Sequence, residues 1–301
     1  MAKIVDYGAF EERLRRVMPD AGERDPAVPA DTGPRWELLR QFQREWGYEV
    51  PEGVEPWPRW SEDRHKAYVR RLEQEWTGEE DDEFGGVDFS LPVPDAIDQW
   101  WDLPFNSFTY SAKLYYTNPE YPPTVRPDPS GYGIAGAIQR NSDLVPPDAD
   151  RRVCVFMAEY EYCNEWGYPA ADAHLPDPRV LVSVSDDTWV LQARSITEFF
   201  LLLAVHRLPP SLGWTVETDV TDEQERLLRA ELTPMGFEPW RELEHHTVVL
   251  GGPDVIAYFD RDHDWDLTVA GRTREAVDAL GDRLGLDWSD EISAPHCSNE
   301  E

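Results

Sequence analysis

Basic residues are scarce in this chain of 301 residues. It has 28 lysines and arginines against 60 aspartates and glutamates, a formal net charge of −32, and its lysines are Lys3, Lys66 and Lys113. A field of that sign repels phosphate backbones and anionic membranes, so we expect no direct binding to nucleic acid or to a membrane. The same field would steer a basic protein toward the chain. A composition that simply keeps the protein soluble is the alternative explanation.

Cysteines and long apolar runs are also few. Cys154, Cys163 and Cys297 are odd in number, and their spacing fits neither a disulfide framework nor a Cys-x-x-Cys metal clip. No run of about 18 apolar residues occurs, and the first residues contain no apolar stretch typical of a signal peptide. The sequence therefore predicts a cytoplasmic protein with reduced thiols.

The common catalytic and cofactor motifs are missing. The chain has no G-x-S-x-G, no G-x-x-x-x-G-K-[ST] and no H-E-x-x-H, and its G-x-G-x-x-G string at 131–136 follows a proline-rich loop. The acidic run 260–266 resembles a calcium loop, but Trp265 and Gly271 stand where that loop needs Gly and Glu. We predict no catalytic residues, no metal site and no cofactor. An enzyme site assembled from scattered carboxylates and histidines is the alternative.

Apolar residues recur at helical spacing in the first third of the chain and again before its middle. The segments with this pattern are 10–17, 35–47, 62–76 and 96–101. Ser195 and Glu198 form a capping box before the apolar run 199–205, so a buried helix should begin there and end at Pro209-Pro210. Four of these helices precede the middle of the chain and one follows it.

Strand patterns dominate the middle and return near the end. Residues 153–158 are continuously apolar, 180–184 alternate, and 188–192 follow an Asp-Asp turn. Later, a helix opening at Thr221 precedes strands at 247–250, 255–259 and 267–269 and a last helix that Gly285 caps. Residues 117–136, rich in proline and glycine, are expected to form loops.

These patterns predict an α+β fold with a mixed or antiparallel sheet packed by helices. We expect a helical N-terminal extension with a proline-rich linker over 1–61 and a core domain over 62–208. A small appended α-β-β-β-α unit over 209–292 and a frayed tail over 293–301 complete the organisation.

An acidic, aromatic strip follows the first central strand and is the candidate binding surface. Tyrosine and tryptophan dominate interface energies, and surrounding carboxylates would steer a cationic partner. The candidate partner-binding residues are Glu159, Tyr160, Glu161, Tyr162, Asn164, Glu165 and Trp166, with Tyr121 and Tyr132 from the nearby loop. Trp166 lies among polar residues and is expected in a polar loop. In the alternative, Tyr160 and Tyr162 pack inside the sheet and only Trp166 is exposed.

The order of elements over 62–206, about half of the chain, resembles the SUKH superfamily, the Smi/Knr-type proteins found among bacterial toxin immunity factors. The resemblance rests on four short stretches: Leu91-Pro92 with the helix ending in Trp100-Trp101, the strand 153–159 with its aromatic turn, Asp177-Pro178-Arg179-Val180, and Thr188-Trp189 followed by Phe199-Phe200-Leu201. The acidic insert 77–88 and the lack of a glycine near Leu103 depart from the family pattern.

The resemblance implies a non-enzymatic domain that neutralises a polymorphic toxin by docking directly onto it. The partner would be a basic toxin domain, with a nuclease as one candidate. The alternative function is a regulatory scaffold or adaptor that binds an endogenous partner.

Overall fold

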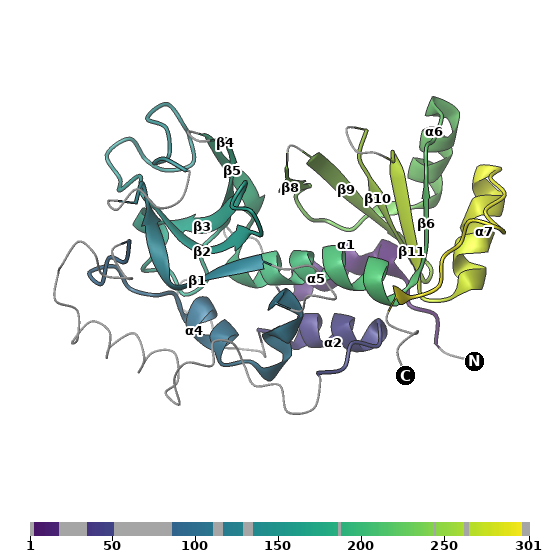
Figure 1. Cartoon of the computed structure of the whole chain (residues 1–301), viewed down its shortest axis with the longest axis horizontal. Coiled ribbons are helices and arrows are strands. Elements are labelled where there is room, and N and C mark those ends of the chain that lie inside the picture. The colour runs from purple at the N-terminus through teal and green to yellow at the C-terminus, as the bar shows by residue number, and fades with distance from the viewer. Residues whose placement is uncertain are drawn as a thin grey trace. The chain divides into compact units, whose positions relative to one another are not determined.

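The computed structural model describes residues 3–17, 35–50, 86–110, 117–128, 135–185, 188–243, 245–261 and 265–296. They form an α+β protein with two antiparallel sheets, which confirms the expected fold class (Figure 1). The chain divides into two compact units, Met1–Glu49 with Phe200–Trp240 and His245–Glu301, and Val50–Phe199 with Arg241–Glu244. The helix expected over 62–76 lies outside the described residues. No helix in the described ranges is long and apolar enough to cross a membrane.

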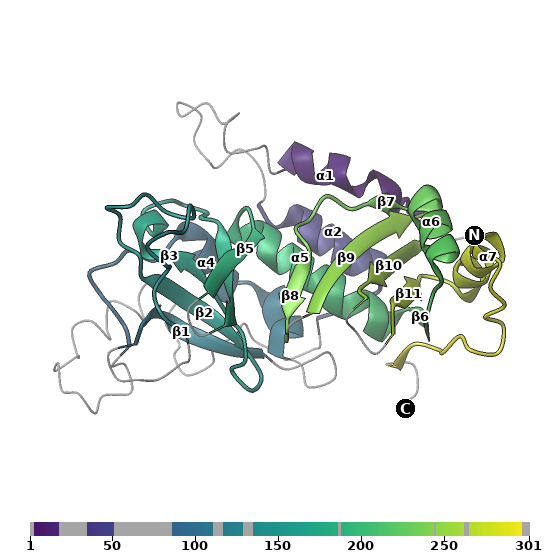
Figure 2. The same cartoon turned by 90° about the horizontal axis from the view of Figure 1, so that it is seen from above.

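The second unit, seen from above in Figure 2, is built on a five-stranded sheet. Its strands pair in chain order. Its strands are β1 (Thr117–Arg126), β2 (Val153–Glu159), β3 (Glu165–Pro169), β4 (Val180–Ser185) and β5 (Thr188–Ala193), accompanied by α4 (Asp95–Trp101), η2 (Pro104–Tyr110) and η3 (Ala170–Asp172). β2 is buried along its whole length, as its continuous apolar run predicts. It is an interior strand of this sheet, paired with β1 on one side and β3 on the other.

Opposite faces of β2 pack against different parts of the unit. Val153 and Val155 join an apolar cluster with Ile138 and Val145, which come from the segment between β1 and β2. Phe156 makes an edge-to-face contact with Phe199, with ring centroids 5.3 Å apart. The sheet is thus covered on both sides.

β1 corrects the expectation that 117–136 is entirely loop. The strand contains three prolines, and its pairing with β2 is interrupted between Pro119 and Thr124. Proline cannot donate a hydrogen bond to a ladder, and β1 tolerates it because it is an edge strand. Proline content alone therefore gave a misleading prediction.

The first unit is built on a six-stranded sheet covered by two helices (Figure 1). Its strands are β6 (Trp214–Thr218), β11 (Leu267–Gly271), β10 (Val255–Phe259), β9 (His245–Gly252) and β7 (Thr233–Pro234) in order. β8 (Trp240–Glu242) also pairs with β9, and of its residues Trp240 belongs to this unit. The helices are α6 (Asp222–Glu231) and α7 (Arg274–Leu284). The helix opening at Thr221 and the cap at Gly285 are both present, as predicted, and Thr221 forms a capping box with Gln224.

The N-terminal helices belong to this same unit. They are η1 (Tyr7–Ala9), α1 (Phe10–Val17) and α2 (Glu37–Glu45). Tyr7 is fully buried and stacks on Trp46 at 5.7 Å between centroids. Arg272, after β11, donates from Nε to the carbonyl of Glu45 at 2.9 Å and from Nη1 to the Asp254 carboxylate at 2.6 Å. Residues 3–17, residues 35–49 and the C-terminal sheet thus share one core.

The other end of the chain is also tied to this sheet. Ser293 pairs with Thr215 of β6 through two main-chain hydrogen bonds of 2.8 and 3.0 Å. The sequence had placed Ser293 at the start of a frayed tail. Its main chain instead extends the sheet by one residue beyond β6.

Helix α5 (Ile196–Leu212) begins as predicted but does not stop at Pro209-Pro210. Ser195 Oγ accepts from the Glu198 amide at 3.1 Å, as expected of an N-cap. Proline at position 209 removes the hydrogen bond that the Val205 carbonyl would accept in a regular helix. The Tyr258 hydroxyl donates to that carbonyl instead, at 2.5 Å. A tertiary partner therefore satisfies the group that proline leaves free.

Replacing Tyr258 by phenylalanine should lower the free energy of unfolding by about 1 to 2 kcal/mol, because it leaves the buried Val205 carbonyl without a donor. Urea denaturation of the two proteins measures the difference. Thr247→Val is the control. It removes a hydroxyl that donates to the Asp260 carboxylate at a half-buried position, and it should cost less stability than Tyr258→Phe. An unchanged midpoint in Tyr258→Phe would show that the proline turn needs no such partner.

Candidate functional site

The candidate site is the turn between β2 and β3. Tyr160 is 59% exposed, and Glu161 and Cys163 are exposed beside it. Tyr162 has a φ of 62°, in the left-handed region that non-glycine residues seldom adopt. The turn closes through main-chain hydrogen bonds from Tyr162 to the Glu159 carbonyl and from Glu159 to the Asn164 carbonyl. It therefore presents a tyrosine and a carboxylate at the surface.

Two side chains hold the main chain of this turn. The buried Glu159 carboxylate accepts from the amides of Glu161 and Cys163 through one oxygen, at 2.9 and 3.3 Å. Asn118, on β1, donates to the carbonyls of Glu159 and Tyr160 at 3.1 and 2.7 Å. The turn thus has a fixed conformation that these partners specify.

Asn164 connects the turn to two other segments. Its Nδ2 donates to the Ser183 carbonyl of β4 at 2.6 Å, and its Oδ1 accepts from the Leu243 amide at 2.6 Å. Each segment carries an exposed apolar side chain close to this link: Val184 is 37% exposed and Leu243 is 45% exposed. We call Tyr160, Glu161, Val184 and Leu243 together the turn surface.

A buried ion pair lies directly behind the turn. Arg126 is fully buried, and its Nε donates to Glu165 Oε1 at 2.7 Å. The second Glu165 oxygen accepts from the Ala135 amide at 3.1 Å, and the Glu165 amide donates to Ser183 Oγ at 2.8 Å. Glu165 is therefore committed to the interior and takes no part in a surface.

A second carboxylate, Glu120, is buried near the same arginine. Burial raises its pKa, and the positive charge of Arg126 partly opposes this, while the charge of Glu165 adds to the increase. Hydrogen bonds from Thr124 and Tyr162 also favour its ionised form. Tyr162 is half-buried, and this bond to Glu120 accounts for its inward position.

The expectation that Trp166 lies in a polar loop is wrong. Trp166 is in β3, fully buried, and packs against Phe199 with ring centroids 5.9 Å apart. The alternative, with Tyr160 inside and only Trp166 exposed, is also wrong. Of the other candidates, Tyr121 lies in β1, and Tyr132 lies outside the described residues. The structure thus exposes Tyr160 and Glu161, half-buries Tyr162, and buries Glu159, Asn164, Glu165 and Trp166.

Trp166 could have been located by the pattern around it. Trp166 and Tyr168 alternate along the chain with Gly167 between them, as in a strand with one apolar face. A Cβ at Gly167 would lie 2.6 Å from the Cys154 carbonyl oxygen, so only glycine fits against β2 there. The neighbouring Asn164 and Glu165 make the segment look like a polar loop. The groups that allow these two residues to be buried lie 18 or more positions away in the sequence.

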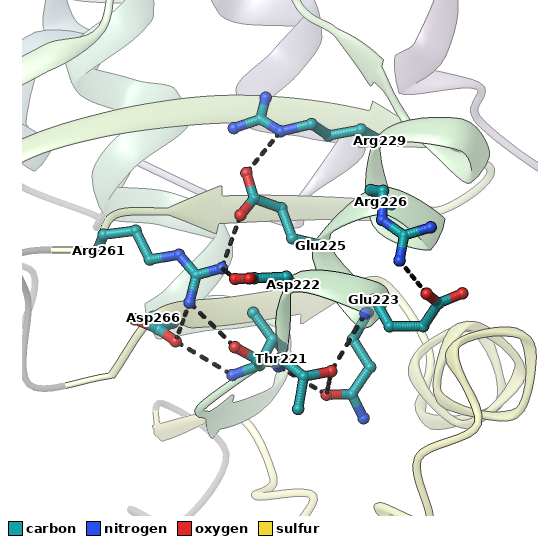
Figure 3. Close-up of polar contacts among 10 residues, drawn as sticks. Thr221, Asp222, Glu223, Glu225, Arg226, Arg229, Arg261 and Asp266 are labelled. Carbon is teal, nitrogen blue, oxygen red and sulfur yellow. Dashed lines mark hydrogen bonds and ion pairs between the residues drawn. The ribbon is translucent and has the colours of Figure 1, made fainter.

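A second polar cluster surrounds Arg261 in the other unit (Figure 3). Arg261 pairs with Asp222, Glu225 and Asp266, at 3.2, 2.7 and 3.0 Å, and donates to the Val220 carbonyl. Hydrogen bonds from Arg261 and Arg229 lower the pKa of Glu225. The cluster connects the start of α6 to the end of β10, so its role is structural.

The two carboxylates at the ends of the acidic run 260–266 also make hydrogen bonds within the protein. Asp260 accepts from the His246 amide at 2.6 Å, and Asp266 accepts from the Val220 amide at 3.2 Å. Residues 262–264 lie outside the described part of the chain. Within the described part, no three histidine, cysteine or acidic side chains converge as metal ligands.

Comparisons with protein-family models, with curated proteins and with solved structures found no match to this chain.

Proposed function

We propose that this protein acts by binding a basic protein through the turn surface and that it catalyses no reaction. In its specific form, the proposal is a SUKH-type immunity protein that blocks a toxin by docking onto it. The observation that carries the binding proposal is the exposed Tyr160 on a turn that Glu159 and Asn118 hold from behind. The resemblance of 62–206 to the SUKH superfamily carries the immunity proposal.

The conformation of the turn favours binding. A partner pays a conformational entropy cost for every loop that it must order, and a turn already fixed by hydrogen bonds lowers that cost. Tyrosine offers a large contact area, a hydroxyl for hydrogen bonding, and few rotatable bonds to immobilise. Val184 and Leu243 would add apolar area around Tyr160.

Charge supports a basic partner. Glu161 lies on the turn surface, and the whole chain carries a formal net charge of −32. Such a field raises the association rate with a cationic protein and changes affinity less. Screening by salt should slow the association of the two proteins.

Tyr160→Ala should weaken binding to the cognate partner by about 2 kcal/mol or more, because it removes the most exposed aromatic ring of the turn surface. Glu161→Gln should chiefly slow association at low salt. The partner to test first is the product of a neighbouring gene, co-expressed with this chain, with affinity measured by calorimetry and protection measured by growth.

Leu243→Ser tests the apolar part of the turn surface, and Leu227→Ser is its matched control. Leu227 is 37% exposed, close to the 45% of Leu243, but it lies on α6 in the other unit. Leu227→Ser should bind and protect like the parent. Binding that survives both Tyr160→Ala and Leu243→Ser at low ionic strength would exclude the turn surface as the docking site. Binding without protection from any toxic activity would favour an adaptor over an immunity protein.

A further inference from the structure

The segment between β1 and β2 forms a hollow of about 550 Å³ on the surface of the second unit. Its lining consists of residues 140–147 and Arg179, the residue before β4. Small-molecule sites commonly have volumes of this order. The hollow shares no residue with the turn surface, so a ligand bound in the hollow would not contact the proposed docking residues.

The walls of the hollow are anchored to the protein interior. Val145 is 3% exposed and packs in the apolar cluster that contains Val153 and Trp189. The Ile138 amide donates to the Arg151 carbonyl at 2.8 Å, which fastens the start of the segment to its end. The hollow therefore exists before any ligand arrives.

Two guanidinium groups line this hollow in a chain that is otherwise strongly acidic. Arg140 is exposed and forms no ion pair with any residue in the described ranges. Arg179 bonds Asp172 through Nε, at 2.9 Å, and its terminal amino groups form no hydrogen bond within those ranges. Both arginines thus keep donors for a ligand.

The remaining lining residues add main-chain donors and an apolar surface. The amides of Asn141 and Asp143 donate to no other residue that the structure describes. Leu144 and Pro146 supply carbon surface. Asp143 is the one carboxylate among the lining residues, and its charge opposes an anion.

We propose that this hollow binds a small organic anion through a carboxylate or phosphate group. The guanidinium groups of Arg140 and Arg179 would donate to its oxygens, and Leu144 and Pro146 would contact its carbon skeleton. Planar guanidinium groups suit both oxyanions, because their paired donors match two oxygens at once.

Titration of the full chain with succinate and with inorganic phosphate at low ionic strength tests this site. The amide NMR signals of Asn141 and Asp143 should shift in a saturable way, while neutral succinamide leaves them unchanged. Arg140→Gln and Arg179→Gln should each raise Kd about tenfold, and Asp143→Asn should lower it about threefold.

Controls separate the site from the general charge of the protein. Arg16→Gln changes a guanidinium that is 71% exposed on α1, and Glu275→Gln removes an exposed carboxylate on α7; both should leave Kd within about twofold of the parent. Binding of phosphate alone, of succinate alone or of both, each with this mutational pattern, supports the site and identifies the group bound. Unmoved Asn141 and Asp143 signals, or a Kd that Arg140→Gln leaves unchanged, would overturn it.

Discussion

Glu165→Ala is expected to lower the free energy of unfolding by about 3 to 5 kcal/mol, because it leaves the Arg126 charge buried without its main partner. The side chains of both residues are fully buried, and their closest N–O distance is 2.6 Å. The substitution also takes the acceptor from the Ala135 amide. Urea denaturation of variant and parent gives the loss directly.

A double variant tests whether the two charges act as a pair. Arg126→Met with Glu165→Leu removes one charge of each sign, but it also takes the cation from the buried carboxylates of Asp128, 3.6 Å from Arg126, and Glu120. It should therefore recover only part of the stability lost by Glu165→Ala. Glu161→Ala, which changes an exposed carboxylate four residues away in the same hairpin, should alter stability by no more than about 0.5 kcal/mol. Strict additivity of the Arg126 and Glu165 changes would contradict the pairing.

Phe156→Ala should also cost about 3 to 5 kcal/mol, because it empties a space at the centre of the five-stranded unit. Phe156 is fully buried and contacts the rings of Phe199 and Tyr168, with centroid separations of 5.3 and 6.4 Å. Denaturant melts measure the change. Val184→Ala, at a side chain 37% exposed on the same sheet, should cost far less. A loss below about 1 kcal/mol in Phe156→Ala would show that the core collapses around the cavity.

The helices and central strands were predictable because their signals are local. The apolar stripe of 10–17, the capping box at Thr221 and the glycine after α7 each act within a few residues of the chain. The apolar run of β2 is equally local. In all of these cases, propensity, capping and burial favour the same element.

The misses arise where distant partners override local chemistry. β1 forms despite its prolines because β2 supplies the pairing, and α5 passes Pro209 while Tyr258 satisfies the Val205 carbonyl. Trp166 is buried because its polar neighbours bond to groups 18 or more residues away. One sequence does not show which residues will provide those bonds.

The candidate site was predictable only in outline. An acidic, aromatic strip at 159–166 was visible in the sequence, and the exposed turn does lie within it. The sequence did not show which residues of the strip are exposed and which support the turn from inside. Glu159 and Asn164 look like surface residues until their main-chain partners are known. The contribution of Leu243 depends on a contact across 79 residues.

The first unit is assembled from Met1–Glu49, Phe200–Trp240 and His245–Glu301, and this division matters while the chain is being synthesised. Tyr7, Phe42 and Trp46 leave the ribosome early, but β7 and β9, with which η1 packs, follow about 190 to 240 residues later. At roughly 5 to 20 residues per second, the early segment waits about 10 to 50 s with its aromatic faces uncovered. The unit of residues 50–199 has all but a few of its residues by then and is free to fold first. Nascent chains of this protein should therefore depend on chaperones during that interval, and chains released early should aggregate through their N-terminal aromatic residues.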